Sequence, residues 1–252
     1  MVNARRWVLL GVSLLGARAA SAAIAPDDFG GSLALTSDYV FHGISQTCGD
    51  PAVQGDLNYR SAGGKSPTEF FAGVWGSAGL GQSGCGNARE ADFYGGYSFA
   101  TGSDSSATLT YTHYSYPGGG YTLPRLAGFR YDYDALEAQW AWQDEVYLTL
   151  AWTPDALHLA YESFARNRSA LSYGLQLHHP LRAGFSISAG VGYDQMADPS
   201  GTGYGFWNAG VGYTLGPVEL TAAYFDTATR AERLFGSYVA GNRVSVTALW
   251  RF

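Results

Sequence analysis

The most constraining feature of this sequence is a two-residue alternation of apolar and polar side chains that continues to the last residue. In the segment 243–252 the apolar side chains share one parity: Val244, Val246, Ala248, Trp250 and Phe252. Successive side chains of a strand point to opposite faces, so this segment predicts a strand with one continuous apolar face. An aromatic residue at the last position resembles the C-terminal signal that the outer-membrane barrel-assembly machinery reads, which assigns that role to Trp250 and Phe252.

The same alternation recurs in segments of about ten residues, the length that a tilted membrane strand needs. The clearest hairpin joins 136–142 to 146–152 through Gln143 and Asp144. No segment shows convincing helical periodicity. The predicted strands cover 32–42, 53–60, 69–78, 90–99, 107–116, 136–142, 146–152, 171–177, 185–193, 207–213, 218–224 and 243–252.

The connections between these segments alternate between short and long, as 216–217 and 227–241 illustrate. Bacterial barrels place short turns in the periplasm and long loops outside, with an even number of strands. The sequence therefore predicts an all-β fold, a closed antiparallel transmembrane barrel of about twelve strands in the cell outer membrane. A soluble β-sandwich is the alternative, since its strands also alternate.

Aromatic residues at both ends of the apolar faces favour the membrane barrel, because they predict two interfacial girdles. The outer girdle is predicted from Phe41, Trp152, Tyr193 and Trp207, and the inner one from Tyr59, Trp142, Tyr213 and Trp250.

Residues 1–22 are interpreted as a cleavable signal peptide, which leaves 23–252 as the barrel. Arg5 and Arg6 precede the apolar run 7–16, and Ala20-Ser21-Ala22 forms a small-residue cleavage site. Removing three of the 15 basic residues leaves 12 against 21 acidic ones, a balance that excludes a nucleic-acid binder by bulk charge. Export in a Gram-negative cell implies as partners periplasmic chaperones, the assembly machinery, outer-membrane lipid and lipopolysaccharide.

A family resemblance rests on the stretch LTSDYVFHGISQTCGDPAVQGDLNY at 35–59, with further matches at FFAGVWGS (70–77), EADFYGGYS (90–98) and Tyr116-Pro117. These motifs resemble the TorF-type porins, an outer-membrane family of poorly defined function. The resemblance covers most of the mature chain and is strongest in its first half. It implies a small diffusion pore for transport of ions or small solutes, with no catalytic residues and no cofactor.

Two cysteines, Cys48 and Cys85, fall in the first and second predicted outer loops. Neighbouring loops in an oxidising compartment favour a disulfide, which would stabilise the fold by roughly 3–4 kcal/mol in the chain-entropy model. Two free thiols or a metal site are the alternatives.

The predicted lumen face is rich in acidic residues, and carboxylates in a narrow channel favour cations. The alternative is an interior plugged by salt bridges, in a non-conducting structural, adhesive or receptor-like barrel, and an outer-membrane lipase or protease is a third possibility. An enzyme of this kind needs a nucleophile beside an acid–histidine pair, and no nucleophile motif accompanies Asp38 and His42 on the predicted face. The adjacent His178 and His179 point opposite ways, so they do not act as a pair. The predicted pore-lining residues are Asp38, His42, Asp56, Arg60, Glu90, Asp92, Glu137, Asp194, Glu219 and Arg243, and the same acidic and basic sets include Glu145 and Arg251.

Overall fold

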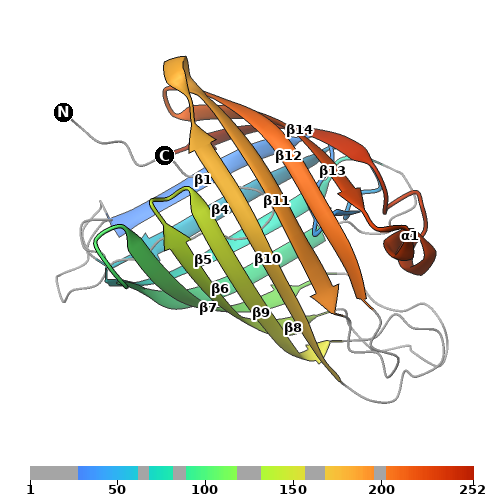
Figure 1. Ribbon diagram of the computed structural model, residues 1–252, viewed down its shortest axis with the longest axis horizontal. Helices are drawn as coiled ribbons and strands as arrows, with labels where there is room; N and C mark the ends of the chain where they lie inside the picture. The colour runs from blue at the N-terminus through green and yellow to red at the C-terminus, as the bar shows by residue number, and fades with distance from the viewer. Residues whose placement is uncertain (1–27, 62–67, 82–88, 118–131, 157–167, 196–202) are drawn as a thin grey trace.

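Twelve antiparallel strands close into a single barrel in the computed structural model, which describes residues 28–61, 68–81, 89–117, 132–156, 168–195 and 203–252 (Figure 1). Each strand pairs with its neighbours in chain order, and the ring closes where the first strand meets the last. This confirms the predicted fold class. The barrel strands are β1 (Phe29–Thr36), β4 (Ala52–Arg60), β5 (Glu69–Gly79), β6 (Arg89–Ala100), β7 (Ser105–Ser115), β8 (Tyr133–Trp142), β9 (Val146–Ala156), β10 (Arg168–Pro180), β11 (Phe185–Gln195), β12 (Gly203–Leu215), β13 (Val218–Thr227) and β14 (Arg243–Arg251).

The closing seam lies between β1 and β14, where Leu33 stands opposite Trp250. Phe252 extends this seam, because its N–H donates to the carbonyl of Gly31 at 3.1 Å and its carbonyl accepts the Gly31 N–H at 3.0 Å. A side chain at Gly31 would collide with the Phe252 ring, since a Cβ there would lie 2.8 Å from it. Glycine at this position therefore lets the C-terminal aromatic pack flat against the first strand.

Apolar side chains cover the outside of the barrel, as the alternation predicts. They include Leu33, Leu57, Leu109, Leu150, Ile187, Val211, Leu220 and Val246, all of which are largely exposed in the isolated chain. A continuous exposed surface of this kind fits contact with lipid rather than with water. No helix within the described parts of the chain is both long and apolar enough to cross a bilayer.

Aromatic pairs mark the two ends of this surface. Near the end that carries Phe252, here called the terminal end, the pairs are Phe29–Tyr59, Phe70–Tyr97, Phe185–Tyr213 and Trp250–Phe252, with ring centroids 4.7–5.5 Å apart. Toward the opposite end, here called the loop end, Tyr173 pairs with Tyr193 and Trp207 with Tyr224. These pairs fit two interfacial girdles.

Phe41 departs from this pattern and corrects the predicted outer girdle. The first strand ends at Thr36 rather than continuing to residue 42, and Phe41 turns into the barrel, where its ring stacks on that of His42 at 4.0 Å. The alternation carries on beyond Thr36, but β1 pairs with β14 and with β4 only as far as Thr36. β14 continues to Arg243 beside β13 alone, because the chain leaves the sheet after Ser37 and turns into the barrel.

The two ends of the barrel are built differently. Tight turns join strands at the terminal end, for example at Gln143 and Asp144, whose φ values of 54° and 57° suit a two-stranded ribbon, and at Gly216. At the loop end a short helix, α1 (Thr229–Phe235), lies between β13 and β14 (Figure 1). The sequence predicted no helix, because seven residues around one buried alanine, Ala231, are too few to show a period.

Two facing assignments follow from the register. In the predicted strand 69–78 the alternation is ambiguous, because Phe70 and Phe71 are adjacent and only one of them can face lipid. The structure exposes Phe70 and buries Phe71 inside the barrel. His178 is buried while His179 is exposed, as adjacent strand positions require.

The opposite ends give a test of orientation. Ser103, in the exposed turn between β6 and β7, lies at the terminal end, and the exposed Ser237 follows α1 at the loop end. In intact Gram-negative cells an impermeant thiol reagent is expected to label Ser237→Cys and to leave Ser103→Cys unlabelled until the outer membrane is breached. Labelling in the reverse order would contradict the predicted orientation, and the parent chain controls for the native cysteines.

Phe252 gives a test of closure. Its deletion removes both backbone bonds to Gly31 and is expected to lower the unfolding free energy by about 1–3 kcal/mol. Less barrel should then resist unfolding in detergent on unheated gels. Phe252→Tyr keeps the backbone pair and the ring and should assemble normally. Equal yields of the deletion and the parent would show that the seam does not depend on this residue.

Candidate functional site

The segment that follows β1 folds into the barrel rather than away from it. Residues 37–51, here called the inner loop, contain a small hairpin of β2 (Val40–Phe41) and β3 (Ile44–Ser45). The hairpin turns at His42 and Gly43, both with positive φ, and a Cβ at Gly43 would lie 2.5 Å from the methyl group of Thr227. Glycine is thus required both by the turn and by the close approach to the wall.

The inner loop reaches across the lumen from one wall to the other. At one side the ring of Tyr39 packs on Trp75 of β5, with centroids 5.5 Å apart. At the other side Nδ1 of His42 lies 3.0 Å from the Asp194 carboxylate of β11. Strands β5 and β11 stand half-way round the ring from each other, so the loop crosses the full width of the barrel.

Asp38 anchors the start of the inner loop through polar contacts. Its carboxylate accepts hydrogen bonds from the hydroxyls of Ser45 and Thr47 and forms an ion pair with Arg243 at 3.2 Å. Its carbonyl accepts the hydroxyl of Ser245 at 2.7 Å. These contacts tie the loop to itself and to β14.

Apolar packing anchors the tip of the hairpin. Ile44 is buried against Tyr204 of β12 and against Ala231, Val239 and Ala240 of the segment around α1. The N–H of Ser45 also donates to the Val239 carbonyl at 2.8 Å. The inner loop and the last outer segment therefore form one packed unit at the loop end.

His42 is held between aromatic rings, with Phe41 on one face at 4.0 Å and Phe206 on the other at 4.8 Å. Burial by itself would lower the pKa of His42, but the neighbouring Asp194 carboxylate outweighs it, and the net result is a raised pKa. The imidazolium is thereby favoured at this contact. Burial, and then the carboxylates Glu90 and Asp92, raise the pKa of Tyr39 well above its ordinary value, so its hydroxyl stays protonated.

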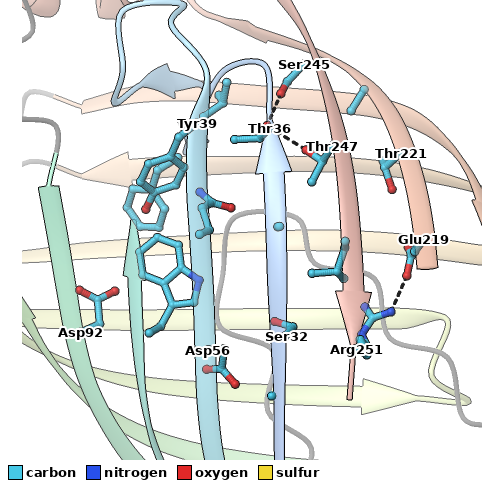
Figure 2. Close-up of a pocket in the computed structure, with 18 of the residues that line it drawn as sticks. Ser32, Thr36, Tyr39, Asp56, Asp92, Glu219, Thr221, Ser245, Thr247 and Arg251 are labelled. Atoms are coloured by element: carbon cyan, nitrogen blue, oxygen red, sulfur yellow. Dashed lines mark hydrogen bonds and ion pairs between the residues drawn. The ribbon is translucent and has the colours of Figure 1, made fainter. Parts of the chain in front are cut away.

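A cavity of about 380 Å³ lies beneath the inner loop (Figure 2). It follows the inner face of β1 from Gly30 and Arg251 near the terminal end to Phe41 under the loop. Hydroxyl and amide side chains such as Ser32, Gln54, Thr221 and Thr247 line it alongside charged ones. A smaller cavity of about 90 Å³ lies on the far side of the hairpin, beside His42 and Glu137. The lumen is polar and hollow, and the inner loop divides it.

Acids outnumber arginines among the described residues of the lumen. Each of the three arginines described there pairs with an acid: Arg60 with Glu69 at 3.5 Å, Arg243 with Asp38 at 3.2 Å and Arg251 with Glu219 at 2.7 Å. Within the described residues no ion pair with a basic side chain is recorded for four other lumen acids, which are Asp56, Glu90, Asp92 and Glu137. Asp56 instead accepts the Tyr94 hydroxyl at 2.6 Å, and Glu90 accepts that of Tyr116 at 2.9 Å.

Most of the predicted lining residues therefore face the interior, with two corrections. Glu145 lies in the turn between β8 and β9 and bonds to the exposed, outward-facing His179 at 2.8 Å, so it is not a lumen residue. Asp38 and His42 lie in the inner loop rather than on a strand face. They contact different partners, Arg243 and Asp194, and do not form a pair that could act together.

Three residues of the barrel interior were not predicted from the sequence. Glu69 is almost fully buried beside Arg60, and Tyr39 and Trp75 meet below the hairpin. The predicted strand 32–42 puts Tyr39 on the same face as Phe41, toward lipid, because it assumes an unbroken strand. The turn signal His42-Gly43, followed by a further turn at Cys48-Gly49, could have revealed the loop.

Cys48 lies near the end of the inner loop with a φ of 55°. Cys85 is outside the described residues, as are residues 1–27, so the disulfide and the signal peptide stay predictions.

The chain belongs to a family of bacterial proteins of unknown function, Gcw_chp, whose model matches residues 19–251. No curated protein matches the sequence. The TorF-type resemblance is not confirmed by these comparisons.

Solved structures share the architecture. The KdgM porin is 9% identical, with a TM-score of 0.52 over 88% of this chain and 99% of its own. A chain from a study titled "Unveiling the Mechanism Behind the in-meso Crystallization of Membrane Proteins" is 11% identical, with a TM-score of 0.56 over 89% of this chain and 83% of its own. At these identities the likeness concerns the fold. The chain is a multi-pass β-barrel of the outer-membrane type.

The inner loop gives a test of its own. Replacement of residues 40–45 by two glycines removes the hairpin but keeps Asp38 and Thr47. The single-channel conductance in planar bilayers is expected to rise roughly two-fold or more, because the variant lacks the hairpin that crosses the lumen. Insertion of two glycines in the turn 101–104 is the matched control and should leave conductance unchanged. Equal conductance of the loop variant and the parent would show that the hairpin does not obstruct passage.

Proposed function

We propose that this protein is a small diffusion channel of the outer membrane that prefers cations, with the inner loop as its constriction. The observation that carries the proposal is the charge of the residues that line the larger cavity, which are four acids (Asp38, Asp56, Asp92 and Glu219) and two arginines (Arg60 and Arg251). Carboxylates in a narrow, low-dielectric passage attract cations because the field there is poorly screened.

The family resemblance and the structural neighbour support the same class. The TorF-type motifs imply a small pore, and the neighbour described as a porin shares the fold. A barrel of twelve strands is narrower than the 16- to 18-stranded porins, so the passage suits ions and small solutes. Within this proposal the signal peptide delivers the chain to periplasmic chaperones and to the assembly machinery, and a Cys48–Cys85 bridge fastens the inner loop to the next outer loop.

A non-conducting barrel with a structural or receptor-like role is the second candidate. The inner loop favours the non-conducting barrel, because contacts of Asp38, Ile44 and His42 hold the hairpin in place across the lumen. Such a barrel would bind a solute below the loop without releasing it to the other side. Planar-bilayer recording separates the two, since only the channel conducts.

Selectivity tests the proposal directly. The double variant Asp56→Asn and Glu137→Gln removes one acid from each cavity while it keeps the size of both side chains. The ratio of cation to anion permeability, obtained from the reversal potential in a salt gradient, is expected to fall roughly two-fold or more.

Asp134→Asn is the matched control for this variant. Asp134 is an exposed acid that bonds to the outward-facing Tyr111, so its loss should leave the ratio unchanged. An unchanged ratio in the double variant would contradict the cation preference, and a parent protein with no conductance at all would reject the channel in favour of the second candidate.

A further inference from the structure

One row of side chains across three strands sets Asp92 between two aromatic rings. In the register, Trp75 of β5 stands directly opposite Asp92 of β6, and Asp92 stands directly opposite Tyr114 of β7. Directly opposed residues have Cβ atoms about 4.5–5.5 Å apart on the same face. All three side chains line the cavity below the inner loop.

A fourth side chain, that of Tyr39, covers this row from the inner loop. Its ring meets that of Trp75 at 5.5 Å with a tilt of 58° between the planes. Tyr39 also lies close enough to Glu90 and Asp92 to interact electrostatically with both. Figure 2 shows Tyr39 and Asp92 on the same side of the cavity. Asp92 is thus surrounded by aromatic rings from a loop and two strands.

The Asp92 carboxylate is buried without a matching charge. Asp92 is only 3% exposed, and its Oδ1 has no hydrogen-bond partner among the described residues. Glu90, two positions along the same strand, is also buried and interacts with it electrostatically. Two neighbouring buried carboxylates are costly to keep unless a proton or a cation compensates them.

We infer that this row is a binding site for organic cations of the amine or quaternary ammonium class. Asp92 would supply the negative charge, and Trp75, Tyr39 and Tyr114 would supply the faces of their rings, which attract a cation. The cavity volume of about 380 Å³ admits a small organic ion. The site deepens the proposed function and rests on it for the passage of this ligand through the barrel.

The surroundings favour an organic cation over other ligands. A hard metal ion takes six or more oxygen ligands, and the walls here are aromatic. Within the described residues no cluster of three or more potential metal-binding side chains is found. A neutral sugar could stack on the rings but would leave the two acids uncompensated. An anion would meet the Asp92 carboxylate.

Calorimetry on the full-length barrel in detergent tests the site independently of conductance. The probes are choline and its uncharged carbon isostere, dimethylbutanol, with magnesium chloride as the metal probe. Choline is expected to bind at least tenfold more tightly than the isostere and to quench tryptophan fluorescence. Magnesium is expected not to compete.

Two variants assign the binding. Asp92→Asn should weaken choline binding about tenfold or more, and Trp75→Leu should do the same while Trp75→Phe retains most of it. Glu219→Gln is the matched control, because Glu219 lines the same cavity on β13, away from this row, and is paired with Arg251. Since the Trp75 variants keep both acids, they remain informative if Asp92→Asn fails to fold.

The outcomes separate this inference from the proposed function. Absence of choline binding, equal binding of the isostere, or displacement by magnesium would overturn the site, even in a barrel that conducts ions. The same holds if Asp92→Asn folds and binds choline as the parent does. In that case a proton shared with Glu90, rather than a bound cation, would compensate the Asp92 carboxylate. Choline binding in a barrel without conductance would retain the site and reject the channel.

Discussion

The closure of β1 between β14 and β4 is the contact on which the rest of the structure depends. In a bilayer every backbone N–H and C=O must be paired within the protein, and only closure leaves no strand edge. Closure also sets which side chains of β1 face inward, because a shift of one residue at the seam would turn its lumen side chains toward lipid. The pairing of Leu33 with Trp250, and of Gly31 with Phe252, thus fixes both the apolar exterior and the acid-rich interior.

A closed barrel of this size encloses more volume than its strand side chains fill, and the inner loop uses that space. A hydrogen bond between Asp38 and Ser45 pairs polar groups of the loop, and Ile44 packs in an apolar cluster. The hairpin can therefore lie in the lumen without joining the barrel sheet. In the channel that we propose, the inner loop rather than the number of strands therefore sets the width of the passage. The loop also brings Tyr39 to a wall that would otherwise present Trp75 and Asp92 alone.

The sequence predicted the strands well and the lumen unevenly, for one physical reason. Alternation reports which face meets lipid, so strands such as 146–152 and 243–252 were recognised with the correct facing. It does not report which residues meet across the ring. Tyr39 and Phe41 were assigned to lipid because their parity matched Leu33 and Leu35, whereas the chain had already left the sheet at Thr36. Ion pairs such as Arg60 with Glu69 depend on register between strands and were not predictable from either strand alone.

The distribution of charge differs between the walls of the lumen. Arg243 and Arg251 each hold an acid within 3.2 Å along the β14 wall, where the inner loop is anchored and the seam closes, so charge there stabilises structure. On β6, three strands from β1 along the ring, two acids have no basic partner among the described residues, and aromatic rings replace the arginines as their neighbours. A ring face attracts a cation and leaves the carboxylate charged, whereas an arginine would neutralise the carboxylate. In the binding site that we infer, the β6 wall therefore keeps its negative field for a mobile ligand, whereas the acids of the seam wall are already paired with arginines.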